Sequence, residues 1–161
     1  MLWDVAMKVL LGMLLGMAIV GGGAFLYFKL GYAPVATTAP PMPFEEFMAK
    51  AALKATIARQ PAAESPIQPD ASNLAAGAQI YRDSCAVCHG LRDQPETGIA
   101  KGMFPKPPQL MKGKGVTDDP AGETFWKVKN GIRLTGMPGF GASMADQQLW
   151  QVTLFLQQGG K

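Results

Sequence analysis

The amino-acid sequence predicts a mainly α-helical protein, with one N-terminal transmembrane helix and a small domain of a few short helices and long loops. An apolar run without charges occupies residues 9–28, near the start of the 161-residue chain. Later segments repeat apolar residues at helical spacing, and no alternating apolar and polar run is long enough to indicate a strand. The 19 glycines and 13 prolines exceed average usage, which indicates linkers and long turns between the helices.

The charge and the rare residues exclude several function classes. The net charge of +3 is small and scattered, so it does not indicate a nucleic-acid partner. Two cysteines are too few for a disulfide-rich scaffold, and a single histidine excludes sites that need several imidazoles. The chain is 48% hydrophobic and 17% charged, an apolar excess that its elements have to explain.

The first element, residues 1–30, is expected to be a membrane anchor that contacts the membrane through residues 9–28. Twenty residues of helix span about 30 Å, the thickness of a bilayer's hydrocarbon core. A cleaved signal peptide usually has a shorter apolar core, and a buried core helix would need a partner of similar length. Glycines at positions 12, 16 and 21–23 also allow a second helix to approach closely in lipid, although the pattern is weak.

The second element, residues 31–69, is expected to be a Pro/Ala-rich linker with a short amphipathic helix at about 44–60. Pro43 suits the first helical position, with acidic residues early in the helix and basic residues late. The helix is either a solvated spacer or a docking helix on a partner or on the membrane surface. Phe44 and Phe47 favour docking, because a spacer would leave both rings exposed.

The third element, residues 70–161, is expected to be a domain of short helices in long loops. Asn73 can cap a helix that reaches Ser84, and Ser143 with Asp146 resembles a capping box for a last helix to about Gln158. A middle helix is expected to start at Asp119-Pro120 and to end at Gly131. Because these helices make a meagre core, a large apolar group is expected to complete it.

Both cysteines and the histidine are contiguous, in the segment Cys85-Ala86-Val87-Cys88-His89. This C-x-x-C-H pattern is typical of c-type haem attachment, in which two thiols form thioether bonds and the imidazole binds iron. A redox-active cysteine pair would be expected near a strand-helix-strand pattern, and a zinc site would need a carboxylate as fourth ligand. A disulfide would not explain the adjacent histidine. The pattern predicts one haem c, attached through Cys85 and Cys88.

Residues 70–161 resemble a class I c-type cytochrome. The resemblance implies a cytochrome c-like domain around a covalent haem, with His89 as one axial ligand and a methionine near the C-terminus as the other. Met137, in Gly-Met-Pro-Gly-Phe before the last helix, matches that position, and Met144 is its rival. Met103 and Met111 are weaker candidates, because they lie in the loop directly after the haem motif and the family's methionine ligand lies near the C-terminus.

The same resemblance assigns supporting residues. In the family, a small and an aromatic residue on the first helix cross an apolar and an aromatic residue on the last; the matching positions are Gly77, Tyr81, Val152 and Phe155, with Trp150 as a further contact. The carbonyl of Pro108 matches the acceptor of the imidazole Nδ1–H, with Pro107 as an alternative register. Trp126 is similar to the family's buried tryptophan near a haem propionate, and Arg133 could pair with a propionate. Ordinary core packing, or a surface charge for Arg133, is the alternative for each.

The resemblance implies a function in electron transfer between redox protein partners of a respiratory or photosynthetic chain, with the protein docked to a larger membrane complex or part of one. Such a chain is not an enzyme, because His and Met ligands leave no open position on iron. Since thioether haem is attached outside the cytoplasm, the domain is expected on the periplasmic side of the inner membrane. The alternatives are a haem-based sensor or peroxidase-like enzyme in which Met137 is displaced, and a metal-binding module without haem.

Lysines of the segments that are expected to border the haem could steer the domain to acidic partners, or could simply be a soluble surface. They are Lys101, Lys106, Lys112, Lys114, Lys127 and Lys129.

Overall fold

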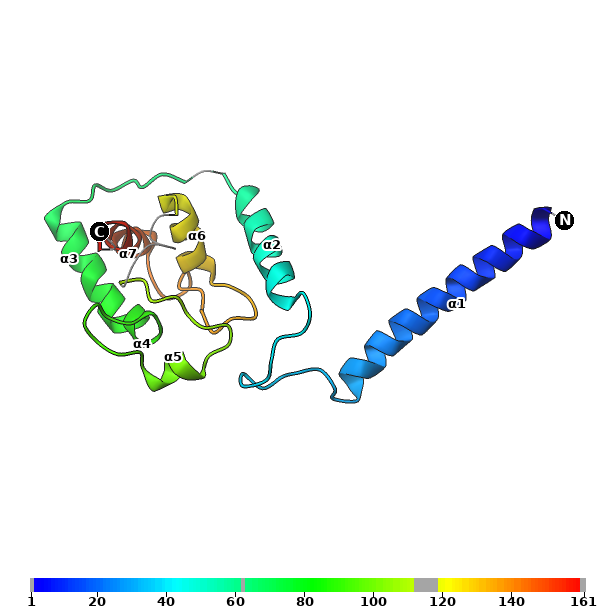
Figure 1. Ribbon diagram of the computed structural model, residues 1–161. Helices are drawn as coiled ribbons and strands as arrows, with labels where there is room; N and C mark the ends of the chain where they lie inside the picture. Colours follow the sequence, from blue (N-terminus) through cyan, green and yellow to red (C-terminus); the bar gives the residue numbers. More distant parts are fainter. Residues whose placement is uncertain (1, 62, 112–118, 160–161) are drawn as a thin grey trace. The chain divides into compact units, whose positions relative to one another are not determined.

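The structure is a computed structural model that describes residues 2–61, 63–111 and 119–159. The described residues form helices, turns and loops without a β-strand, which confirms the predicted mainly α-helical class (Figure 1). The chain divides into two compact units, Met1–Glu45 and Glu46–Lys161.

The first unit is dominated by helix α1, Leu2–Lys29. Its apolar stretch, Trp3–Lys29, has a mean hydropathy of 2.2 and none of it is buried. Asp4 lies in the first turn and Lys29 in the last, where each charge matches the helix dipole; Lys8 is the third charged residue of the helix, so residues 9–28 carry no charge. By length and composition, α1 could cross a membrane, which supports anchoring at the N-terminus.

Helix α2, Glu45–Ala58, begins later than Pro43, the first helical position that the sequence predicted. Phe44 adopts a left-handed φ of +64° and so interrupts the helical path, and the Glu45 carboxylate accepts the backbone N–H of Met42 at 2.8 Å. The rings of Phe44 and Phe47 are 78% and 67% exposed, while Ile57 is buried. The exposed rings leave the choice between spacer and docking helix open.

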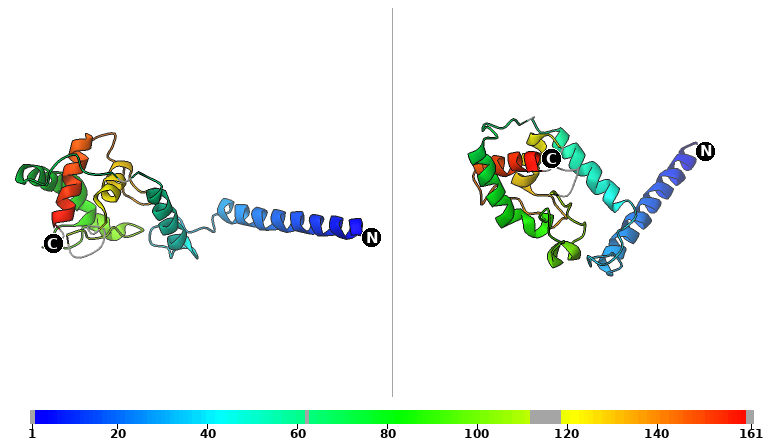
Figure 2. Two further views of the ribbon diagram at one scale, coloured as in Figure 1. Left: turned by 90° about the horizontal axis from the view of Figure 1, so that it is seen from above. Right: turned by 60° about the vertical axis from the view of Figure 1, so that its left-hand side comes forward.

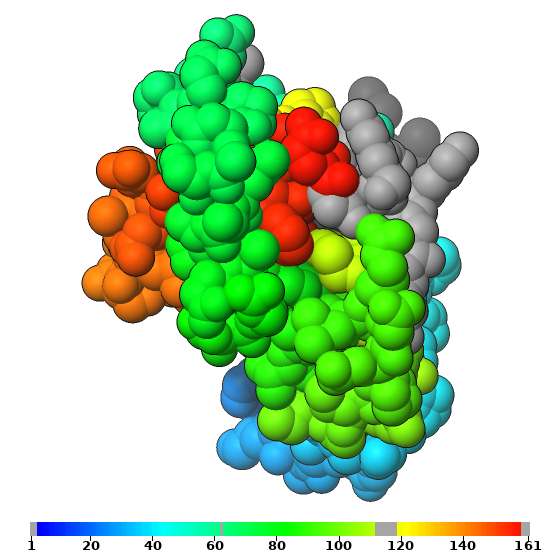
Figure 3. Space-filling view, turned by 90° about the vertical axis from the view of Figure 1, so that its left-hand side faces the viewer, coloured from blue at the N-terminus to red at the C-terminus, as the bar shows by residue number. Residues whose placement is uncertain are grey.

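The second unit is built mainly from α3 (Ala71–Ile80), α6 (Ala121–Asn130) and α7 (Asp146–Gly159). Helix α3 packs along α7, and α6 packs on α7 as well, an arrangement that the views of Figure 2 also show. The space-filling view shows α3 lying directly against α7 (Figure 3). A Cβ at Gly77 of α3 would stand 2.1 Å from the carbonyl oxygen of Gln151, so only glycine allows this approach.

The core lies where these helices meet. Its buried members are Tyr81, Ala86, Met111, Val128, Leu149, Val152 and Leu156. Phe155 contacts Tyr81 with ring centroids 5.6 Å apart, and Phe125 stacks on Trp150 at 4.1 Å. The core therefore joins α7 to the end of α3 and to α6, around the segment that carries the two cysteines.

Two predicted helix caps are wrong. The carboxylate of Asp70, not Asn73, caps α3 by accepting the Asn73 backbone N–H at 2.8 Å. At α7 the Ser143 hydroxyl donates to the carbonyl of Phe140, and Gln148 accepts the Ala145 N–H instead. In both cases another polar residue nearby in the chain, Asp70 or Gln148, makes the capping bond instead. The middle helix, Ala121–Asn130, does lie between Pro120 and Gly131, which are its N-cap and C-cap residues, and the φ of Gly131 is +69°.

Candidate haem site

The C-x-x-C-H segment lies on a continuous helical path. Helix α3 runs into a π-helical turn, Tyr81–Cys85, which is followed by α4, Ala86–His89. The Ala86 N–H donates to the Tyr81 carbonyl, the wider bond of a π turn. The turn ends on Cys85, so the helix widens where the motif begins.

The structure records both cysteines as free thiols. Burial, and to a smaller extent the neighbouring Cys88, raises the pKa of the Cys85 thiol to about 11. Cysteines of redox-active pairs have a lowered pKa, because their chemistry needs a thiolate. Cys85 therefore lacks the electrostatic environment of a catalytic cysteine, which was one alternative for this motif.

The ring of His89 is oriented by a backbone carbonyl. Its Nδ1 lies 2.9 Å from the carbonyl oxygen of Pro108, so the proton on Nδ1 donates there and Nε2 remains free to bind a metal. Pro108, not Pro107, supplies this acceptor. Burial lowers the pKa of His89, although the bond to Pro108 acts in the opposite direction. The ring is therefore neutral near pH 7, the form that binds metal ions.

The backbone around His89 is held from two sides. The Tyr81 hydroxyl donates to the carbonyl of Gly90 at 2.7 Å and to that of His89 at 3.2 Å. The Gln109 amide donates to the Cys88 carbonyl at 3.2 Å, and the Leu110 N–H donates to the His89 carbonyl. The sequence predicted Tyr81 only as an aromatic residue of the helix crossing, and it predicted neither its hydroxyl bonds nor the role of Gln109. The only signal was a tyrosine with a hydroxyl at the aromatic position, and a glutamine after Pro108.

Gln109 also fixes the identity of residue 90. Its buried Oε1 has no partner among the described residues and lies 2.1 Å from where a Cβ at Gly90 would stand. Gly90 has a φ of +74°, which also favours glycine. The chain therefore turns away from the motif directly after His89, and an orphaned polar atom lies beside that turn.

Met137 lies in the loop between α6 and α7, packed against the core. Its N–H donates to the Thr135 hydroxyl at 3.1 Å, and its carbonyl accepts the N–H of Ile132 at 3.3 Å. The N–H of Phe140 donates to the carbonyl of Val128 on α6 at 3.0 Å. These bonds fold the loop back on itself, so the backbone position of Met137 is set by its own loop and by α6.

The other methionines differ in their surroundings. Met144 is also half-buried against the core, as the rival of Met137 should be, whereas Met111 is a buried member of it. The methyl group of Met103 lies 2.2 Å from where a Cβ at Gly136 would stand, so Met103 packs beside the Met137 loop. The assignment of Met137 as a ligand stays a prediction.

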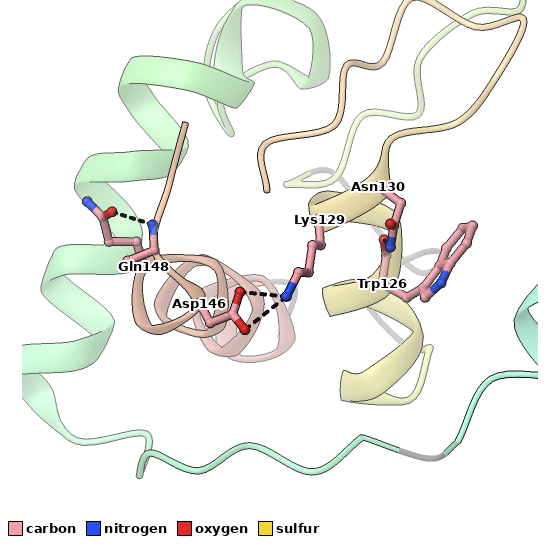
Figure 4. Close-up of polar contacts among 6 residues, drawn as sticks. Trp126, Lys129, Asn130, Asp146 and Gln148 are labelled. Carbon is pink, nitrogen blue, oxygen red and sulfur yellow. Dashed lines mark hydrogen bonds and ion pairs between the residues drawn. The ribbon is translucent and has the colours of Figure 1, made fainter. Parts of the chain in front are cut away.

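In the described part of the chain, no hydrogen bond or ion pair joins the side chains of Trp126 and Arg133 to these residues. Trp126 is half-buried on α6, and its carbonyl accepts the Asn130 amide; its ring points away from α7 in Figure 4. Arg133 is exposed in the turn after α6. Their role at the propionates also stays a prediction.

The predicted lysine surface is partly neutralised. Lys127 pairs with Asp119 and Lys129 pairs with Asp146. Lys112 and Lys114 lie outside the described residues.

The residues present fit a covalent haem. Two unpaired thiols precede a neutral imidazole whose ring is already oriented, an orphaned Gln109 oxygen lies beside them, and a half-buried thioether packs on the same core. In the described ranges no cluster of three or more His, Cys, Asp and Glu side chains could hold a metal ion by itself. Zinc, the second alternative for the motif, would need such a cluster.

Comparison with known proteins agrees with this geometry. The family model described as cytochrome c oxidase, cbb3-type, subunit III matches residues 72–156. No curated protein matches. Four chains of solved structures match, among them a chain of the reducing HAO-like protein complex of Kuenenia stuttgartiensis. It is 22% identical, with a TM-score of 0.52, over 67% of this chain and 55% of that one, a likeness of fold alone.

The present chain thus spans about half the length of that solved relative. The family match covers more than half of the present chain, and it includes the C-x-x-C-H segment, the Pro108 acceptor and the Met137 loop. The chain belongs to the family of c-type cytochromes described as cbb3-type cytochrome c oxidase subunit III.

Proposed function

We propose that the protein is a membrane-anchored monohaem cytochrome that carries single electrons between redox partners of a respiratory or photosynthetic chain, as a subunit of a larger membrane complex or docked to one. Residues 1–30 are the anchor, 31–69 the linker with its helix, and 70–161 the haem domain. Family membership implies electron transfer and covalent haem c. The single observation that carries the proposal is the Pro108 carbonyl, which orients the only histidine directly after two free thiols.

The residues of the site have separate tasks. Cys85 and Cys88 would hold the haem through thioether bonds, and Nε2 of His89 and the sulfur of Met137 would be the ligands of its iron. Bound in this way, haem supplies a one-electron couple whose potential is raised by the methionine. Pro108 keeps the imidazole oriented and makes it a better donor. Trp126 and Arg133 lie near the propionates in this proposal.

The proposed location is the inner membrane, with a single span and the haem domain on the periplasmic side. The apolar helix α1 supports a span, and haem attachment through thioethers supports the side. The family is named for an oxidase subunit, and the solved relative comes from a complex, which supports protein partners at a membrane.

Covalent haem is tested by a haem-stained denaturing gel of the full chain. The wild type should keep a stained band, and the double variant Cys85→Ala/Cys88→Ala should lose it, because only thioether-bound haem survives denaturation. An unstained wild-type band, from cells that attach haem to another c-type cytochrome, would refute the proposal.

The kind of function is tested by ligand binding. The reduced protein should bind carbon monoxide slowly or not at all, since Met137 occupies the position that the gas needs. Rapid binding would instead support the sensor or peroxidase-like alternative.

Migration of the detergent-extracted native protein as a free monomer would contradict the proposal that it is a subunit of a larger complex.

A further inference from the structure

Lys129, in the last turn of α6, contacts three parts of the chain. Its Nζ donates to both carboxylate oxygens of Asp146, at 2.7 and 2.9 Å, and so reaches the first turn of α7 (Figure 4). Its carbonyl accepts the N–H of Gly141 at 2.9 Å. Its side chain passes along Gly141, where a Cβ would stand 3.0 Å from the Lys129 Cγ. Its Nζ also lies 5.5 Å from the centroid of the Phe125 ring.

These contacts close the loop that carries Met137. The loop leaves α6 after Asn130 and enters α7 at Asp146, so the ion pair joins its two ends. Between them, Gly139 lies against the backbone of Lys129 and Asn130, where a Cβ would come within 2.7 Å of Asn130. Residues 139–141 of the loop are therefore held against α6. The Lys129–Asp146 pair joins the end of α6 to the start of α7, where the loop ends.

The Lys129–Asp146 pair contributes little to the global stability of the domain. Its side chains are 38% and 62% exposed, and ion pairs of that exposure contribute little to the free energy of unfolding. Each charge nevertheless lies at the helix end that favours it, Lys129 at the C-terminus of α6 and Asp146 at the N-terminus of α7. The pair ties the two ends of the loop together, and a loop with tied ends has fewer open conformations, so even a weak pair disfavours opening.

We propose that Lys129 and Asp146 are positioning residues that restrain the Met137 loop and so keep the Met137 thioether on the iron. This inference rests on the proposed His89 and Met137 ligation. The pair would then control how often the loop releases Met137. Release of Met137 is the step that would allow a haem protein to bind a ligand, and an electron carrier avoids it.

The test is imidazole binding to the oxidised full-length holoprotein in detergent at pH 7, followed by loss of the Met–iron charge-transfer band. Imidazole binds only the fraction in which Met137 is released, so its apparent affinity reports that fraction. Lys129→Gln and Asp146→Asn should each tighten imidazole binding roughly two- to fivefold. The double variant should bind no more tightly than either single variant, because one interaction is lost in all three. Lys129→Arg, which keeps the charge, should bind as the wild type does.

The matched control is Lys127→Gln, on the same helix as Lys129, which removes ion pairs with Asp119, just before α6, and with Glu123, within it. Among the described residues, no hydrogen bond or ion pair joins these side chains to the Met137 loop, so imidazole affinity should stay at the wild-type value even if the thermal midpoint falls. Equal tightening in Lys127→Gln and Lys129→Gln would overturn the inference in favour of general destabilisation, and so would an unchanged affinity in Lys129→Gln. Absence of the charge-transfer band in the wild type would instead overturn the proposed ligation itself.

Discussion

The crossing of α3 and α7 is the contact at which the smallest substitution should have the largest effect on stability. A Cβ at Gly77 would stand 2.1 Å from the Gln151 carbonyl oxygen, 2.6 Å from its carbon and 2.8 Å from the Phe155 Cβ. Cβ atoms essentially never approach other heavy atoms within 3.0 Å, so Gly77→Ala requires the helices to separate by about 0.9 Å (3.0 minus 2.1). Two of the three atoms belong to the backbone, so no rotation of a side chain relieves the clash.

The size of the effect follows from two opposing terms. Overpacking of a close contact costs about 1–3 kcal/mol, and a clash with backbone belongs at the upper end of that range. Alanine has a helix propensity about 1 kcal/mol better than glycine, which offsets part of the cost. The expected net loss in the free energy of unfolding is therefore about 2 kcal/mol, or roughly 10 °C in the thermal midpoint of a domain of this size.

The assay is equilibrium urea denaturation of the full-length holoprotein in detergent, followed by haem absorption and far-ultraviolet circular dichroism. Gly102→Ala is the matched control, because no atom lies within 4 Å of its Cβ position and α5, Gly98–Gly102, does not enter the crossing. The control should stay within about 0.5 kcal/mol of the wild type. Equal stability of the Gly77 and Gly102 variants would refute the close crossing.

Three further predictions concern the haem site and its supports. Met137→Ala should remove the Met–iron charge-transfer band from the oxidised spectrum, whereas Met144→Ala should keep it; the opposite result would make Met144 the ligand. Tyr81→Phe should lower the free energy of unfolding by about 1–2 kcal/mol, because the buried Gly90 carbonyl loses the partner that lies at 2.7 Å, and an unchanged urea midpoint would contradict this bond. The pKa of Asp70 is lowered from 3.8, chiefly by the Asn73 backbone N–H, so its cap stabilises α3 above that pH and is lost as the pH falls through the folded-state pKa. Asp70→Ala should thus unfold at a lower urea concentration than the wild type at pH 7. The difference between the two urea midpoints should become smaller below about pH 4; a difference that does not change with pH would show that the charge of Asp70 plays no part.

The features that were predictable from the sequence are those for which few other residue types could serve. A haem motif needs two thiols and an imidazole at fixed spacing, and the single histidine left no second candidate. Family resemblance then pointed to the Pro108 carbonyl, which does lie 2.9 Å from His89 Nδ1. Helix caps were less predictable, because Asp70 and Asn73 are both good capping residues and only geometry decides between them. The left-handed Phe44 has no sequence signal at all, since non-glycine residues rarely adopt that conformation.

Lys129 shows why the remaining part of the site needed a structure. In the sequence it is one of several lysines near the haem, with a solvated surface or a partner-binding role as the available interpretations. Its carboxylate partner is 17 positions away, beyond the reach of any local pattern, and the glycine beneath its side chain belongs to a third segment. Because the pair is intramolecular, less of the charge at Lys129 remains to attract an acidic partner. The contact with Asp146 therefore weakens the hypothesis that Lys129 attracts an acidic partner. The same contact joins the two ends of the Met137 loop, and the imidazole titration measures how strongly it restrains that loop.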